Sequence, residues 1–326
     1  MNDAWLGDPR SPVLILCAPR SFSSVVCAML GQHPEMYGFP ELNLFLTGSV
    51  GELLQLDDRM SHVTGRQGAS YTPGLTRAVA QLLFRTQSED ALVRSLAWLG
   101  NRARWSASRM LGHLLRLVEP RIGVEKSPRT CLSTRSLQRA LAFHAGTRFL
   151  HLTRDPLNTI HSIVESLTAG TPSGVSACST EERKRFAVRL WCFCQQTILR
   201  ETAAVPSRRF LRVRGEDLLN HADTELPPIC RWIGIRDDPD AIQAMLHPER
   251  SPFARLGAWP SGGDQDAGFL ASPRLRPARS PSTPDSIESW NLEHQDKFAI
   301  LALARLLGYA DRVSQDVGTG RGVVLK

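Results

Sequence analysis

Apolar residues along this chain form short unbroken runs, which alternate with longer stretches whose apolar positions recur every three or four residues. Unbroken runs are typical of buried parallel strands, and the longer period is typical of helices that cover a sheet. The runs predict strands at residues 13–18, 122–124, 148–153 and 209–213. The periodic stretches predict helices at residues 24–32, 75–85, 89–99, 107–118, 134–144, 157–167, 181–203, 226–233 and 286–307.

This alternation predicts an α/β fold, because right-handed strand–helix–strand units build a doubly wound sheet. We expect a single domain over residues 1–326, a three-layer sandwich with helices on both faces. Its central parallel sheet should have four to five strands, and a helical insertion should accompany it. Ligands of such sheets bind beyond the carboxyl ends of the strands, so the chemistry is expected there.

Two regions depart from the alternation. Residues 57–118 begin with a polar, glycine-containing stretch, 57–74, which predicts a surface loop, and then continue as helices. We expect this loop and helical insertion to shape the pocket of an acceptor substrate. Residues 251–285 are rich in Pro, Gly, Ser and Arg without periodicity. Such a long irregular stretch indicates either a functional lid or disorder.

Composition and charge narrow the class of ligand. With 42% hydrophobic and 22% charged residues, the chain resembles folded soluble proteins. The formal charge is +7 and is carried almost entirely by arginine, which binds phosphate groups bidentately and favours anionic ligands. Seven cysteines without a C-x-x-C pair predict reduced thiols in a cytoplasmic protein, not a zinc site or disulfides. No signal core is evident, and the longest apolar run is too short to span a membrane.

The first predicted strand leads into a basic, hydroxyl-rich turn. Its apolar run breaks at Pro19, and an apolar helix follows the turn. Unpaired backbone N–H groups and the positive end of the helix dipole meet there, which favours a phosphate-like ligand. The turn lacks the two glycines and the lysine of a Walker loop. An ordinary serine-capped turn is the alternative. The residues of the turn are Arg20, Ser21, Phe22, Ser23 and Ser24.

Three later motifs supply further polar groups. Glu41 follows the first helix in Gly-Phe-Pro-Glu-Leu, so we expect it near the turn. Lys126 lies at the carboxyl end of the second predicted strand, in Gly-Val-Glu-Lys-Ser-Pro. Arg154 ends the third, in Thr-Arg-Asp-Pro, and Ser162 lies two turns into the next helix. Arg154 and Ser162 are therefore expected to contact one phosphate from two sides.

This order of motifs resembles the sulfotransferase superfamily, which transfers a sulfuryl group from 3′-phosphoadenosine 5′-phosphosulfate (PAPS) to an acceptor. It is most similar to the branch with an Arg-Ser turn, which includes bacterial enzymes and tyrosylprotein sulfotransferases. The resemblance covers residues 13–43 and 120–167 well and 209–277 loosely, and it implies a P-loop-like fold. It assigns the turn to the 5′-phosphosulfate. It assigns the 3′-phosphate to Arg154 and Ser162, joined by Arg255 and Gly257 from a lid over the nucleotide.

The chain departs from the family pattern at four positions. Phe22 stands where glycine is common, and Arg20 where animal cytosolic enzymes have lysine. Gly215 replaces a tyrosine that often lies against adenine, and Leu256 replaces the lysine of the lid motif.

The resemblance also implies roles for the polar groups. Glu41 is expected to be the general base for a small-molecule hydroxyl, and Lys126 to stabilise the leaving phosphate with Arg20 and Ser23. Neither a metal nor nucleic acid is expected to take part.

Alternatives remain for these residues and for the chain. Glu41 could be a solvated loop carboxylate, and Lys126 could form a surface ion pair with Glu125. A kinase using ATP and magnesium is the runner-up function. A third hypothesis is a nucleic-acid or partner-binding protein with arginine-rich helices at residues 75–118 as its contact face. The sequence does not decide the acceptor or the oligomeric state.

Overall fold

The computed structural model describes residues 11–64, 71–169, 179–255, 258, 267–278 and 290–309. Five parallel strands form one sheet in the order β2-β3-β1-β4-β5, which confirms the predicted α/β sandwich. Strands added to both sides of β1 are typical of a doubly wound sheet. The strands are β1 Val13–Leu16, β2 Met36–Gly38, β3 Ile122–Lys126, β4 Arg148–Thr153 and β5 Phe210–Arg214.

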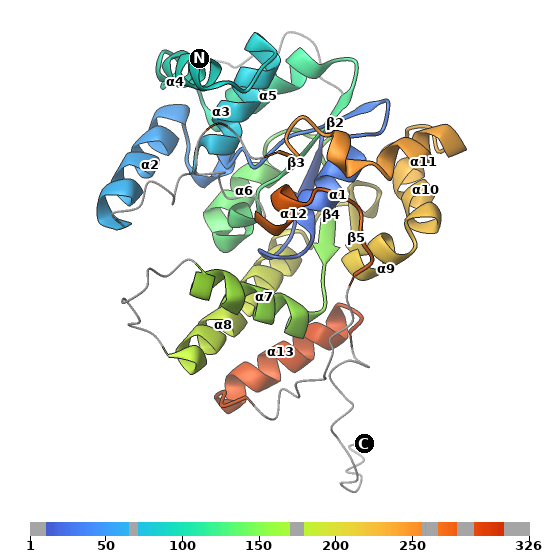
Figure 1. The fold of residues 1–326 in the computed structure, drawn as a ribbon. Coiled ribbons are helices and arrows are strands. Elements are labelled where there is room, and N and C mark those ends of the chain that lie inside the picture. Colours follow the sequence, from blue (N-terminus) through green and yellow to red (C-terminus); the bar gives the residue numbers. More distant parts are fainter. Residues whose placement is uncertain are drawn as a thin grey trace, which may run out of the picture.

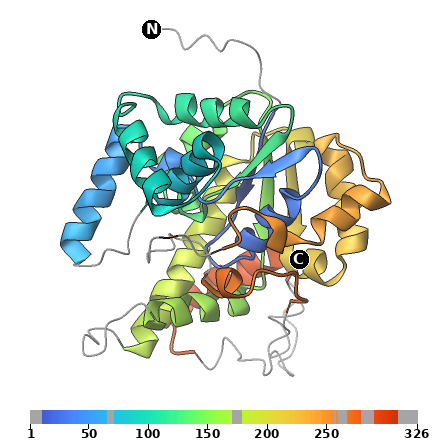
Figure 2. The same ribbon diagram turned by 45° about the horizontal axis from the view of Figure 1, so that its top comes forward.

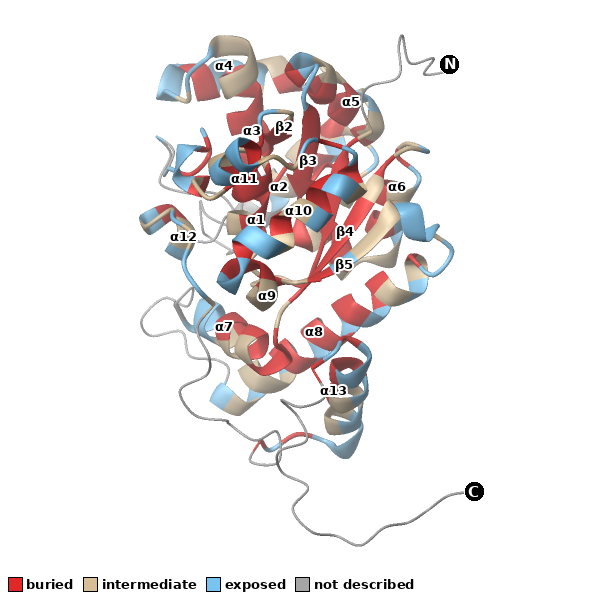
Figure 3. Ribbon diagram, turned by 90° about the vertical axis from the view of Figure 1, so that its right-hand side faces the viewer, coloured by how far each residue is buried: buried red, intermediate tan, exposed pale blue. Residues whose placement is uncertain are grey.

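Alternate residues of β1 enter two different hydrophobic cores. Leu14 and Leu16 belong to one cluster of buried side chains, and Val13 and Ile15 belong to the other. Successive side chains of a strand point to opposite faces, so an unbroken apolar run indicates a sheet covered on both sides. In Figure 3, β3 and β4 are coloured as buried almost throughout, whereas β5 at the edge of the sheet is mostly intermediate.

Helices cover both faces of the sheet (Figure 1). One face packs against α1, α9, α10 and α11, the other against a larger set of helices. The first set comprises α1 Ser23–Leu30, α9 Gly215–Asn220, α10 Ala222–Ile233 and α11 Pro239–Met245. The second includes α5 Ala107–Val118, α6 Thr134–Leu141, α7 Pro156–Ala169, α8 Thr180–Glu201 and α13 His294–Leu306.

Beside one edge of the sheet lie α2, α3, α4 and α5, which appear together in blue to teal in Figure 2. These helices are α2 Val50–Thr64, α3 Pro73–Val79 and α4 Glu89–Gly100, with a π-helical turn, Ala80–Phe84, after α3. The prediction of a surface loop from residue 57 is wrong as far as residue 64, because α2 continues to Thr64. Asp57 on α2 accepts hydrogen bonds from Tyr71 and Thr72, which ties that helix to the start of α3.

Other differences concern short elements. Strand β2 was not predicted, because its three residues are too few to show a pattern. The short helices α9 and α11 were not predicted either. The last helix begins at His294, eight residues later than predicted, and within the lid region residues Ala267–Ala271 form α12. Among the described residues, no helix has the length and apolarity needed to cross a membrane.

Candidate active site

The turn between β1 and α1 has the backbone of an anion cradle. Arg20 and Phe22 have φ angles of 68° and 63°, in the left-handed region that costs a non-glycine residue about 1–2 kcal/mol. Phe22 precedes α1 and makes no side-chain cap, so the first N–H groups of the helix are not used by it. The Ser21 hydroxyl is buried without a hydrogen-bond partner in the described structure. Strained backbone with uncapped donors is typical of a site that binds an anion.

Phe22 and Gly215 are coupled in space. A Cβ atom placed on Gly215 would lie 2.6 Å from Cδ2 of the Phe22 ring and 3.1 Å from the carbonyl oxygen of Thr153. The phenyl ring therefore fills the space that a side chain at position 215 would need. The guanidinium of Arg154 lies 4.3 Å from the centroid of the same ring. The two departures from the family pattern at positions 22 and 215 are therefore neighbours in space.

A first polar cluster joins the turn to the end of β4 and to α7. Arg20 Nε donates a hydrogen bond of 3.1 Å to Ser162 Oγ. Arg154 Nη1 donates one of 2.6 Å to the carbonyl oxygen of Arg20. The structure therefore brings together the three residues that the sequence assigned to two phosphates. We call Arg20, Arg154 and Ser162 the outer cluster.

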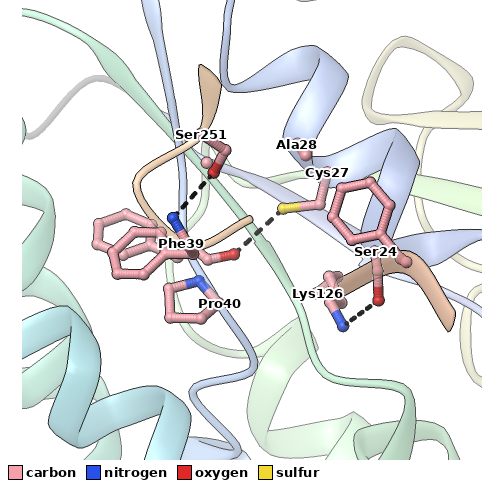
Figure 4. Close-up of a pocket in the computed structure, with 10 residues that line it drawn as sticks. Ser24, Cys27, Ala28, Phe39, Pro40, Lys126 and Ser251 are labelled. Atoms are coloured by element: carbon pink, nitrogen blue, oxygen red, sulfur yellow. Dashed lines mark hydrogen bonds between the residues drawn. The ribbon is translucent and has the colours of Figure 1, made fainter. Parts of the chain in front are cut away.

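A second polar cluster joins the turn to β3 and to the segment after β2. Lys126 Nζ forms an ion pair with Glu41 Oε1, and the two side chains are only 3% and 6% exposed. The same ammonium donates a hydrogen bond of 2.9 Å to Ser24 Oγ (Figure 4). We call Glu41, Lys126 and Ser24 the inner cluster. Glu41 is not a solvated carboxylate, and Lys126 pairs with Glu41 in the interior instead of with Glu125 at the surface.

Glu125 holds the chain on either side of the inner cluster. Its Oε1 accepts hydrogen bonds from the Leu42 amide (3.2 Å) and from the Ser127 hydroxyl, while the Asn43 amide donates to Ser127 Oγ at 2.9 Å. Burial raises the pKa of Glu125 to about 7. This role of Glu125 was not predicted from the sequence. A carboxylate within a buried strand is the available signal, because it needs hydrogen-bond partners.

A small pocket opens beside the inner cluster. Lys126 and Ser24 line it together with Phe39 and Pro40 from the segment after β2 (Figure 4). Ser251, Phe253 and Phe269, all within the predicted lid region, line it as well. Three described residues of the predicted lid region therefore line the same pocket as Lys126 and Ser24.

Arg255 contacts α3 through its main chain. Its carbonyl oxygen accepts a hydrogen bond of 2.8 Å from Arg77 on α3, and it lines a second pocket together with Arg77. Neither Arg154 nor Ser162 is among the residues that line this pocket. The predicted partner Gly257 lies outside the described residues.

Comparison with known proteins decides the family. The profile of the sulfotransferase family matches residues 12–239, which is more than half of the chain. The chain belongs to the sulfotransferase family. The match spans the inner and outer clusters, and a sulfotransferase enzyme is thereby supported. The kinase alternative is not favoured.

Solved structures show the same fold. The sulfotransferase domain from the curacin biosynthetic pathway is 20% identical, with a TM-score of 0.71, over 93% of this chain and 99% of that one. The sulfotransferase domain from the olefin synthase of Synechococcus PCC 7002 is 24% identical, with a TM-score of 0.69, over 93% and 96%. No curated protein matches the chain.

Proposed function

We propose that this protein transfers a sulfuryl group from PAPS to a hydroxyl of a small-molecule acceptor, with Glu41 as the general base. One observation carries the proposal: a single turn contacts both polar clusters. Ser24 at its end bonds to Lys126, and Arg20 at its start bonds to Ser162 and Arg154. Groups on both sides of one turn are suited to a ligand with a phosphate at each end.

The residues present fit such a donor. The uncapped start of α1, the buried Ser21 hydroxyl and the Arg20 side chain suit the 5′-phosphosulfate. Arg154 and Ser162 suit the 3′-phosphate, because an arginine fork binds phosphate bidentately. When bound, the donor supplies the sulfuryl group and a phosphate leaving group. The cationic side chains balance its charge.

The inner cluster supplies the proton chemistry. Glu41 would accept the proton of the acceptor hydroxyl at its carboxylate. Lys126 lies between Glu41 and the turn, so its ammonium can donate to oxygen that gains negative charge during transfer. Because the ammonium is buried and held from two sides, little reorganisation is required during the reaction.

Two variants test this division of roles. Arg154→Gln should weaken binding of 3′,5′-bisphosphoadenosine by about 10- to 100-fold, since a hydrogen bond to a charged group contributes about 1.5–3 kcal/mol. Glu41→Gln should lower kcat by about 10²- to 10⁴-fold and leave this binding intact. Calorimetric titration and steady-state kinetics measure the two effects.

Arg94→Gln is the matched control, because it removes an exposed arginine on α4 that pairs with Asp90. Full turnover in Glu41→Gln would exclude Glu41 as the base. Failure of the unmodified protein to bind bisphosphoadenosine would exclude the donor.

A further inference from the structure

A second, strongly basic pocket lies between α3 and the segment that follows α11. Its volume is about 420 Å³. Three arginines line it, with one carboxylate and two amide side chains: Arg77, Arg250, Arg255, Glu249, Gln81 and Gln87. We call it the Arg77 pocket. The excess of guanidinium groups over carboxylates favours an anionic occupant.

Arg77 is a buried cation without an anionic partner in the described structure. Its side chain is nearly inaccessible, with the residue 4% exposed. Nε donates to Gln87 Oε1 at 2.7 Å, and Nη2 donates to the carbonyl oxygens of Arg255 and Phe253. These acceptors are neutral, and Nη1 has no hydrogen-bond partner among the described residues. Burial lowers the pKa of Arg77 to about 10, so the guanidinium stays charged at neutral pH.

This arrangement is costly for folding unless a ligand compensates it. A charge removed from water without a counter-charge destabilises the folded state, and a buried N–H group without an acceptor destabilises it further. A carboxylate or phosphate in the pocket would offset the uncompensated charge, because its oxygens accept bidentate hydrogen bonds from the guanidinium groups that line the pocket.

The Arg77 pocket adjoins the inner cluster. Helix α3 packs so tightly on the segment after β2 that a Cβ atom on Gly74 would lie 1.9 Å from the carbonyl oxygen of Glu41. Arg77 is three residues further along this helix, about 4.5 Å in rise. Ser251 lines both this pocket and the one beside Lys126. The Phe253 ring, which lines the Lys126 pocket, lies 5.8 Å from the Arg77 guanidinium carbon.

We propose that the Arg77 pocket binds a carboxylate or phosphate monoester carried by the acceptor, while the acceptor's hydroxyl lies at Glu41. The inference rests on the proposed function and names the substrate class of that site. It makes the acceptor bifunctional, with an anionic group held by arginines on one side of Phe253 and the reacting hydroxyl on the other.

The first test measures a free anion. The protein is saturated with 3′,5′-bisphosphoadenosine, which occupies the nucleotide site, and inorganic phosphate is then titrated while thermal unfolding is followed. We expect further stabilisation, because a ligand that binds only the folded state raises its stability. The double variant R250Q/R255Q should weaken this binding at least tenfold, and Arg94→Gln should not. Arg250 and Arg255 are exposed, so replacing them should not prevent folding, whereas replacing the buried Arg77 could.

The second test asks whether the pocket binds an anionic group that is part of the acceptor molecule or only a free anion such as inorganic phosphate. Three matched alcohols, ω-hydroxydodecanoate, ω-hydroxydodecyl phosphate and ω-hydroxydodecanamide, are titrated calorimetrically into the bisphosphoadenosine-saturated protein. We expect the carboxylate or the phosphate to bind at least tenfold more tightly than the amide, and R250Q/R255Q to remove the difference.

Equal or absent binding of the three alcohols overturns the proposal, as does a preference that survives in the double variant. Phosphate binding without a preference among the alcohols also overturns it, because the pocket then takes a free anion. Failure of bisphosphoadenosine to bind is a separate result that removes the donor assignment. The phosphate titration can then be repeated without nucleotide, so the two failures are distinguishable.

Discussion

The inner and outer clusters lie on either side of one turn but differ in burial and in the contacts of their cations. In the inner cluster, Glu41 and Lys126 form a nearly inaccessible ion pair in which a carboxylate balances an ammonium. In the outer cluster, Arg20 and Arg154 are partly exposed and bond to a hydroxyl and a carbonyl oxygen. A buried ion pair favours fixed geometry, and partly exposed guanidinium groups favour binding of an anion.

We therefore expect the inner cluster to contribute more to the stability of the fold than the outer cluster. Removing one partner of a buried ion pair leaves an uncompensated charge, which destabilises a protein by about 3–5 kcal/mol. Exposed guanidinium groups contribute little to stability, because water solvates them when a partner is lost. The clusters should therefore respond differently to equivalent substitutions.

The largest expected effect is that of Lys126→Met. It should lower the free energy of unfolding by about 3–5 kcal/mol, because the Glu41 carboxylate remains buried without its ammonium. Arg154→Gln should change it by less than about 1 kcal/mol. Urea denaturation measures both.

A double variant sharpens this prediction. In E41Q/K126M no charge remains in the inner cluster, so we expect it to be more stable than Lys126→Met alone. If Lys126→Met and Arg154→Gln lower the free energy of unfolding equally, the predicted difference in stability contribution between the two clusters is wrong.

A pH dependence of stability is the next largest effect. Burial raises the pKa of Glu125 to about 7 in the folded protein, against an ordinary value of 4.5. Between these values the folded state binds the proton more tightly than the unfolded state, so stability should fall as pH rises from about 4.5 to 7. The expected loss is about 3 kcal/mol.

Glu125→Gln should remove this pH-dependent loss of stability. A glutamine oxygen still accepts the hydrogen bonds of Leu42 and Ser127, but the side chain does not titrate. Chemical denaturation of both proteins at pH 5 and pH 8 measures the difference. Parallel pH profiles would show that the buried carboxyl does not titrate in this range.

The smallest effect concerns the contact of Phe22 with Gly215. Gly215→Ala should cost about 1–3 kcal/mol, because its methyl group would meet the Phe22 ring and the Thr153 carbonyl oxygen. In a Phe22→Gly background the loss of stability caused by Gly215→Ala should be smaller, because the ring that the methyl group would meet is absent. Glycine itself tolerates the left-handed backbone of position 22. Thermal unfolding of the two single variants and the double variant measures the coupling. Additive penalties would show that the two positions are independent.

Much of the fold was predictable because strands buried on both faces leave continuous apolar runs. The four strands with such runs were found, whereas β2, with three residues, leaves no period. Helix α2 was not predicted, and its second half was taken as a loop because residues 57–74 are polar and contain glycine. The positions of Lys126 and Arg154 at strand ends, and of Glu41 after the first helix, could be predicted from the sequence, and ligands of such folds bind at the strand ends.

By itself the sequence determined four of the five strands, the two covered faces of the sheet and the polar residues at the strand ends, because these depend on local apolar patterns. Only the tertiary structure decided that Lys126 pairs with Glu41, that Phe22 fills the space above Gly215, and that Arg77 lies buried beside the lid segment. Each of these contacts joins residues from distant parts of the chain. Side-chain partners across such distances are set by packing, which no local pattern records.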